Sequence, residues 1–321
     1  MLLTTPLNML QQQVTVATSA RLHMGFFDLT GTAGQMFGGL GMAIDAPCTK
    51  ISLVKSQTLT VEAESNENVD RIVENLLKSH HFPSSFSLKI LQSIPAHAGL
   101  GSGTQMALAI GAGLNQLFNL QLDVLQIAAA ALRGKRSGIG IGAFAQGGFL
   151  LDSGKQDNMI PSIAMRQLAP ADWRLLLVLD ASHAGLHGAA ELQAFQRLKP
   201  AQASVRNMVI EHMLPALQRS DLLAFGAYMQ DLQAYNGEYF APIQGGHYAS
   251  HDVAQVLSWL QANGAPCVGQ SSWGPTGFAI LESQQHAEAL LQQARLAFAN
   301  KSNISFQIVR GKNTGAQITL S

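Results

Sequence analysis

The chain has 321 residues, of which 47% are hydrophobic and 12% charged, and its 20 basic residues balance its 20 acidic ones. This neutral, apolar composition argues against a disordered protein and against nucleic-acid or membrane-surface binding. Two distant cysteines, Cys48 and Cys267, argue against a disulfide framework. No apolar run reaches the roughly 18 residues that a membrane helix needs. We therefore predict a soluble cytoplasmic enzyme with a large core, and the composition favours a homodimer.

The first half of the chain mixes strands and helices without a repeating strand–helix rhythm. Apolar alternation predicts strands over residues 14–20, 49–54, 58–63, 86–90 and 147–152. Helical spacing of apolar residues predicts helices over 69–78, 106–120 and 124–133. This mixture favours an α+β layer with a mixed or antiparallel sheet over a doubly wound fold.

The second half has the same α+β character, after a boundary expected within residues 161–170. The predicted domains are therefore residues 1–168 and 169–321. Strands are predicted over residues 174–179, 278–281 and 305–309. Helices are predicted over residues 189–198, 204–217, 221–236, 252–263 and 286–299.

The stretch PAHAGLGSGT, residues 95–104, leads directly into an apolar helix. Gly99, Gly101 and Gly103 allow the backbone to curl and present several N–H groups to one anion. The helix that follows adds the positive end of its dipole, and Ser102 and Thr104 add hydroxyl donors. On the glycines alone, an anion site and a turn without ligand are equally favoured.

The pattern P-x-x-x-G-L-G-S-G in this stretch resembles the phosphate loop of the GHMP kinase superfamily, whose usual form is P-x-x-x-G-L-G-S-S. The resemblance implies an N-terminal domain like ribosomal protein S5 domain 2 and a ferredoxin-like C-terminal domain. Kinases of this superfamily carry a catalytic aspartate shortly before a glycine pair. Here Gly147 and Gly148 are present, but the preceding Arg136-Ser137-Gly138 contains no aspartate. Ordinary phosphoryl transfer to an alcohol therefore lacks its expected base.

Further stretches resemble one branch, the beta-ribofuranosylaminobenzene 5′-phosphate synthases. They run from residue 21 to residue 318 and include ARLHMGFFDLTG, GKRSGIGIGAFAQGGFLLDSG and VGQSSWGPTGFAIL. Gln35 departs from the pattern, since a basic residue is expected there. The stretch around His187 also matches, which implies a substrate role for it.

The resemblance implies an early step of tetrahydromethanopterin biosynthesis. In that step the ribosyl group of phosphoribosyl diphosphate is transferred to a ring carbon of 4-aminobenzoate or 4-hydroxybenzoate, with release of CO2 and diphosphate. It also implies Mg²⁺ and no organic cofactor. We expect the glycine loop to bind the diphosphate, although the 5′-phosphate is an alternative. The loop residues concerned are Gly99, Leu100, Gly101, Ser102, Gly103 and Thr104.

Arg21, His23 and Arg136 are the candidate catalytic residues that the resemblance implies. From the residues alone, structural roles are favoured: a surface ion pair for Arg21, and a partly buried position with satisfied hydrogen bonds for His23. Arg21 could instead hold a phosphate or a carboxylate bidentately. Lys135 and Arg136 are either a solvated pair or an anion site to which Ser137 contributes.

The remaining candidates divide between structural and substrate-binding roles. Asp28 and Asp152 are candidate Mg²⁺ ligands or turn caps. The polar run before Gly274 is either a capped loop or a wall of an aromatic-acid pocket, with Trp273 against the ring. Its residues are Gln270, Ser271, Ser272 and Trp273.

Two other functions are compatible with the sequence. The first is a small-molecule kinase that uses ATP at the same loop. The second is a catalytically silent regulator that binds a nucleotide. Three results distinguish these functions: turnover of phosphoribosyl diphosphate supports the synthase, turnover of ATP the kinase, and binding without turnover the regulator.

Overall fold

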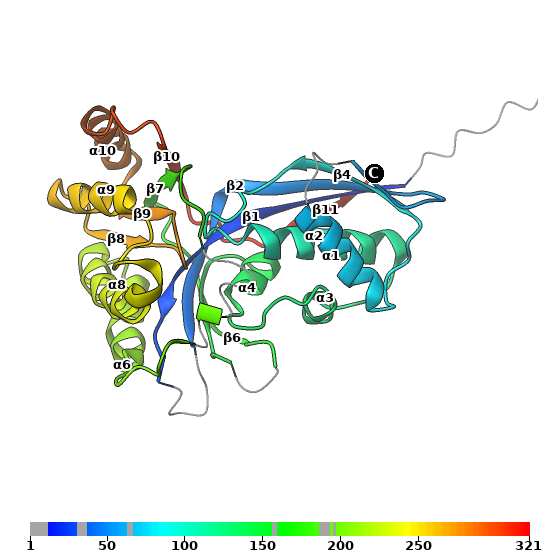
Figure 1. Cartoon of the computed structure of the whole chain (residues 1–321), viewed down its shortest axis with the longest axis horizontal. Coiled ribbons are helices and arrows are strands. Elements are labelled where there is room, and N and C mark those ends of the chain that lie inside the picture. The colour runs from blue at the N-terminus through cyan, green and yellow to red at the C-terminus, as the bar shows by residue number, and fades with distance from the viewer. Residues whose placement is uncertain (1–11, 31–36, 63–66, 156–158, 186–192, 195–196) are drawn as a thin grey trace, which may run out of the picture.

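The computed structural model describes residues 12–30, 37–62, 67–155, 159–185, 193–194 and 197–321. These residues form two lobes, each built on one sheet (Figure 1). No helix among them is both long and apolar enough to cross a membrane.

The first sheet is organised around two long antiparallel strands, β1 (Gln13–Phe26) and β2 (Gly39–Lys55). One end of β2 pairs with β4 (Phe86–Gln92), which is parallel to β3 (Thr60–Glu62). The other end pairs with β5 (Phe149–Asp152), which pairs in turn with β6 (Ile163–Gln167). The last strand, β11 (Gln317–Leu320), returns to the open edge of β1. Because β1 and β2 are so long, the β1–β2 pair extends across both lobes (Figure 1).

Helices α1 (Glu67–Lys78), α2 (Ser102–Phe118), α3 (Val124–Ala130) and α4 (Ile139–Ala145) belong to the first lobe. The α2 helix packs directly on β1 and β2. Its close approach depends on Gly113, because a Cβ there would stand 2.4 Å from Leu53 Cδ1. The nearly uniform apolarity of α2 thus reflects burial between the sheet and its neighbouring helices.

The second sheet is antiparallel in the order β10 (Ile304–Val309), β7 (Arg174–Asp180), β9 (Gly277–Leu281), β8 (Cys267–Gln270). Alternation along β7 explains how both faces are covered. Leu175 and Leu177 enter the core shared with β1, whereas Leu176 and Val178 enter a separate core. That separate core is formed with α9 (His251–Ala262) and α10 (Gln284–Ala297).

The opposite face of the second sheet is covered by α8 (Leu222–Gln244) together with the short helices α6 (Arg206–Met208), η1 (Val209–Met213) and α7 (Leu214–Gln218). The α8 helix also ties this lobe to the end of β1. Gln233 donates to the Met24 carbonyl at 2.6 Å, and Asn236 both donates to and accepts from the backbone of Phe26. The end of β1 is therefore fixed between the lobes.

The α+β class is confirmed, but several elements differ from those predicted. The strand β6 lies inside the expected boundary, and α4, β8 and β11 were not predicted. The helix predicted over 204–217 is three short segments, and the one predicted over 189–198 lies mostly outside the described residues. Because β11 rejoins the first sheet, the two sheets do not divide the chain at a single position.

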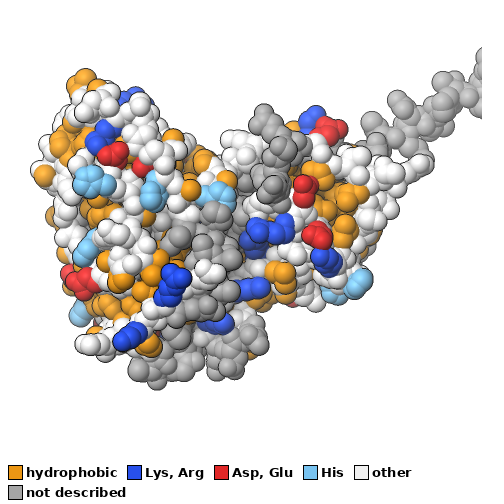
Figure 2. All heavy atoms as spheres, viewed as in Figure 1, with side chains coloured by type: hydrophobic (Ala, Val, Ile, Leu, Met, Phe, Trp, Pro, Cys, Tyr) orange, Lys and Arg blue, Asp and Glu red, His pale blue; other side chains and the backbone are white. Residues whose placement is uncertain are grey.

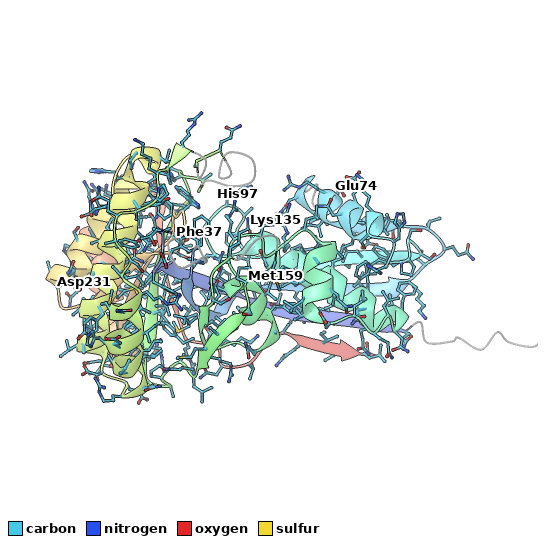
Figure 3. The ribbon with its side chains drawn as sticks, turned by 90° about the horizontal axis from the view of Figure 1, so that it is seen from below. Phe37, Glu74, His97, Lys135, Met159 and Asp231 are labelled. Carbon is cyan, nitrogen blue, oxygen red and sulfur yellow. The ribbon has the colours of Figure 1, made fainter. Side chains whose placement is uncertain are left out.

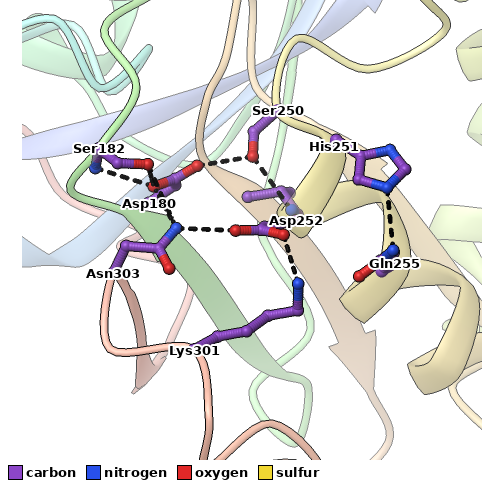
Figure 4. A network of polar contacts seen from close by, with 9 residues as sticks. Asp180, Ser182, Ser250, His251, Asp252, Gln255, Lys301 and Asn303 are labelled. Atoms are coloured by element: carbon purple, nitrogen blue, oxygen red, sulfur yellow. Dashed lines mark hydrogen bonds and ion pairs between the residues drawn. The ribbon is translucent and has the colours of Figure 1, made fainter.

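A buried carboxylate joins three elements of the second lobe (Figure 4). Asp180 accepts hydrogen bonds from the side chains of Ser182, Ser250 and Asn303 at 2.7 to 2.9 Å. Although burial raises its pKa, these bonds lower the pKa of Asp180 to about 2. We expect Asp180→Ala to lower the free energy of unfolding by about 2 kcal/mol at pH 7, because three polar groups lose their partner. Urea denaturation measures this, and an equal loss in the exposed control Asp172→Ala would contradict it.

Candidate active site

A cleft of about 630 Å³ lies between the lobes, beside the glycine loop. Its described lining comes from β1, α1, the segment 97–101, the start of α2, residues 131–137, Lys155 and residues 272–274. His97 and Lys135 mark the cleft in Figure 3, between the helices of the two lobes. On the face shown in Figure 2, Lys and Arg side chains gather near the middle of the molecule.

The glycine loop ends at the cleft as the uncapped start of α2. Gly101 precedes the helix in the left-handed region, with φ 82° and ψ 18°, and no side chain caps the helix. The N–H groups of Ser102 and Gly103 have no backbone acceptor among the described residues. Both residues line the cleft, so the first turn of α2 offers unpaired N–H donors and the positive end of its dipole to a ligand.

The loop is held in place by two other segments that meet at Gly99. Its carbonyl accepts from Arg21 Nη1 at 2.6 Å and from Ser271 Oγ at 2.8 Å. The same Ser271 hydroxyl accepts from the His23 N–H, and the Ser272 N–H donates to the His23 carbonyl. The loop, the end of β1 and the segment 271–274 therefore form one assembly around the cleft.

The described lining of the cleft is strongly basic and contains neither Asp nor Glu. Its basic side chains are those of Arg21, Arg71, Arg133, Lys135, Arg136 and Lys155. Such a lining attracts anions and favours ligands that carry more than one phosphate. Sequence reasoning identified Arg21, Lys135 and Arg136 but missed the other three. Arg133 could have been found beside the predicted pair, whereas Arg71 looks like an ordinary exposed helix residue.

His23 lies at the point where the lobes meet, and only 4% of its surface is exposed. Burial and the nearby charges of Arg21 and Arg136 lower the pKa of His23 to about 3. Its Nε2 has no hydrogen-bond partner among the described residues. A Cβ on Gly39 would stand 3.0 Å from this nitrogen and 3.3 Å from Ser137 Oγ, so the missing side chain of Gly39 leaves room beside both. His23 is therefore a neutral imidazole with an unused hydrogen-bonding atom.

A second, smaller cavity of about 30 Å³ adjoins the cleft. The two share His23, Phe26, Ser272 and Trp273 in their lining. Three aromatic rings pack around the smaller cavity, with Phe240 4.5 Å from Trp273 and 6.3 Å from Phe26 between ring centroids. Gln270 also lines it. The cleft thus opens into an aromatic recess, the kind of wall that a planar ring prefers.

Four predicted site residues do not line either cavity. Leu100 is a fully buried core residue, and Ser271 holds the loop as described above. Asp152 accepts from Ser137 Oγ and from three backbone N–H groups, and it therefore shapes the turn at 137–138. Burial raises the pKa of Asp152, and these hydrogen bonds only partly offset it. Asp28 accepts from the N–H and hydroxyl of Thr30, as a turn cap does.

Neither Asp28 nor Asp152 is among the described residues that line the cleft. Among the residues that the structure describes, no three His, Cys, Asp or Glu side chains are grouped as metal ligands. Gln35 and His187 lie outside the described residues.

Comparison with known proteins identifies the class and then the family. Models of the GHMP kinases N terminal domain and of the GHMP kinases C terminal region match residues 67–148 and 213–300. The structure resembles a homoserine kinase from Cytophaga hutchinsonii, with a TM-score of 0.66 and 18% identity over 99% of this chain and all of that one. It also resembles a mevalonate diphosphate decarboxylase from Staphylococcus aureus, with a TM-score of 0.67 and 13% identity over 96% and 98% of the two chains. The fold is therefore the two-domain GHMP kinase fold.

Sequence similarity is more specific than the fold. A beta-ribofuranosylphenol 5′-phosphate synthase from Methanocaldococcus jannaschii is 31% identical over 298 residues, covering 83% of this chain and 88% of the relative. One from Archaeoglobus fulgidus is 28% identical over 320 residues, covering 94% and 98%. The chain belongs to this synthase family, as its motifs predict.

Proposed function

We propose that the protein transfers the ribosyl 5-phosphate group of phosphoribosyl diphosphate to the carboxyl-bearing ring carbon of 4-hydroxybenzoate or 4-aminobenzoate. The observation that carries this proposal is a basic cleft beside the glycine loop, without described carboxylates, that adjoins an aromatic recess. A kinase needs a group to accept or orient a hydroxyl proton, whereas a ribosyl transfer with loss of CO2 does not.

In the proposed reaction the ring carbon bonds to the anomeric carbon as the bond to diphosphate breaks. The diphosphate leaves with that electron pair. The bond between the ring and the carboxylate then breaks, CO2 departs, and its electrons restore the aromatic ring. The para hydroxyl or amino group supports the step by donating electrons into the ring.

The protein contributes mainly fixed positive charge. The N–H groups at the start of α2 and the guanidinium of Arg21 stabilise the negative charge that grows on the departing diphosphate. These groups are held before the reaction begins, so little reorganisation is needed in the transition state. The predicted Mg²⁺ would reach the cleft on the diphosphate, since phosphate oxygens are among its preferred ligands.

The acceptor is proposed to lie at the junction of the two cavities, with its ring against Trp273 and Phe26. There the Nε2 of His23 is available for a hydrogen bond to a substrate. Because its pKa is about 3, His23 stays neutral at physiological pH and acts through hydrogen bonding rather than charge.

Incubation of the purified protein with phosphoribosyl diphosphate and each acid tests the proposal. We expect CO2 and diphosphate in a ratio of one to one, from at least one of the two acids. Benzoate without the para group is the matched control and should not react. ATP turnover on an alcohol without CO2 release would instead support a kinase, and tight nucleotide binding without turnover would support a regulator.

The same preparation tests the remaining predictions, of which Mg²⁺ and the pathway follow from the family and the homodimer from the composition. EDTA should stop the reaction if Mg²⁺ is required, and sedimentation should give the mass of a dimer. Assignment to tetrahydromethanopterin biosynthesis follows if the product is the ribosyl-substituted phenol or aniline.

A further inference from the structure

One part of the cleft lining consists of two arginines, which no motif predicted, and the side chains beside them. Arg71 and its neighbours Asn68 and Asn75 lie on α1, and Arg133 follows α3. We call these four residues the arginine arm. All of them line the same cleft as the glycine loop.

The arm contacts the end of the loop that begins α2. Arg133 Nη1 and Nη2 lie 3.5 and 3.6 Å from where a Cβ on Gly103 would stand, and Asn68 Nδ2 lies at 3.6 Å. Arg71 Nη2 donates to Asn68 Oδ1 at 3.1 Å, which links the exposed arginine to the same group. Two guanidinium groups are thus gathered beside the unpaired N–H groups of the first turn.

This gathering of like charge is not neutralised by an ion pair of Arg71 or Arg133 with any described carboxylate. The Nε atom of Arg133 is buried and has no hydrogen-bond partner among the described residues. Burial and the nearby Arg71 lower the pKa of Arg133, which reflects the cost of keeping both cations in place. An anionic ligand would remove that cost.

The arm and the recess approach opposite ends of the loop, and this order decides which phosphate the arm can meet. A Cβ on Gly99 would stand 2.4 Å from the Ser271 carbonyl on the recess side, whereas Gly103 faces the arm. By contrast, a Cβ on Gly39 would stand 3.0 Å from His23 Nε2 and 3.3 Å from Ser137 Oγ, so Ser137 and its neighbour Arg136 lie beside His23 on the recess side. A ring carbon that attacks the anomeric carbon approaches opposite the departing diphosphate. The diphosphate therefore points away from the recess.

We infer that the arginine arm binds the terminal phosphate of the diphosphate, while the loop holds the phosphate bonded to the ribose. This inference rests on the proposed function. It makes Arg71 and Arg133 diphosphate-binding residues and leaves the 5′-phosphate to the basic side chains on the recess side.

Calorimetric titration of the full-length protein with inorganic diphosphate and with ribose 5-phosphate tests the inference. We expect Arg71→Met to raise the Kd for diphosphate about tenfold and the Kd for ribose 5-phosphate less than about twofold. Arg133→Met should act in the same direction. Because Arg71 is exposed, Arg71→Met is expected to fold normally, and it tests the inference even if Arg133→Met folds poorly. Arg295→Met, on the exposed face of α10, is the matched control and should change neither.

The outcomes separate this inference from the proposed function. Unchanged diphosphate affinity in Arg71→Met, or a loss confined to ribose 5-phosphate, would overturn the inference alone. A wild-type protein that binds neither diphosphate nor phosphoribosyl diphosphate would remove the proposed function on which the inference rests.

Discussion

Replacing Gly99 with alanine is expected to lower kcat/KM for phosphoribosyl diphosphate by about 100-fold. Gly99 has φ 76°, where an added Cβ costs about 1 to 2 kcal/mol. That Cβ would also stand 2.4 Å from the Ser271 carbonyl and 2.8 Å from the Gly274 carbonyl. Backbone cannot move aside as a flexible side chain can, so the loop and the segment 271–274 must separate. Separation displaces the N–H donors from the diphosphate.

The control for this prediction is Gly245→Ala at the end of α8. Gly245 has φ 84°, but nothing lies within 4 Å of the added Cβ. It therefore carries the same backbone strain without the clash. We expect both variants to lose similar free energy from φ alone, with the loss of kcat/KM confined to Gly99→Ala. Equal activities of the two variants in the diphosphate-release assay would show that the contact with segment 271–274 does not matter.

Acid is expected to destabilise the protein through His23. The pKa of His23 is about 3 in the folded chain and about 6.5 when unfolded, so between these values the unfolded state binds the proton first. The contribution of neutral His23 to the free energy of unfolding is complete above pH 6.5 and is lost as the pH falls toward 3. The slope reaches at most about 1.4 kcal/mol per pH unit. His23→Gln, which cannot titrate, should lose this part of the dependence.

Urea denaturation at pH 7 and pH 5 measures the effect. The drop in free energy of unfolding between the two should be about 2 kcal/mol larger for the wild type than for His23→Gln. His81→Gln, at an exposed position, should behave like the wild type. Identical pH dependence in the wild type and His23→Gln would mean that the imidazole is not held neutral in the folded protein.

Much of the fold could be predicted because it depends on local pattern. The alternation in residues 174–179 and the helical spacing in residues 69–78 predict β7 and α1 to within two residues at each end. Short elements were missed where alternation spans too few residues, as in β8 and β11. The length of β1 and β2 was also missed, because their continuation depends on pairing partners that lie far away in the sequence.

The site was predictable only where a motif marks it. All the predicted glycine-loop residues except Leu100 line the cleft, and so do Arg21, Lys135 and Trp273. Ser271 and Asp152 belong to motifs too, yet their side chains are used up in bonds to the loop and to the turn at 137–138. A motif specifies that a residue matters but not whether its polar atoms face a ligand or the protein.

The sequence by itself determined the position of the glycine loop, the α+β class and the synthase branch, since each follows from residues adjacent or regularly spaced along the chain. Only the tertiary structure decided that Arg133 and Asn68 meet at Gly103, that Arg71 joins them through Asn68, and that His23 is buried beside two arginines. Those features depend on contacts between residues far apart in the sequence, such as α1 and the end of α3, and on the desolvation of side chains during folding. Charge proximity and burial are properties of the folded chain, so no local pattern of residues encodes them.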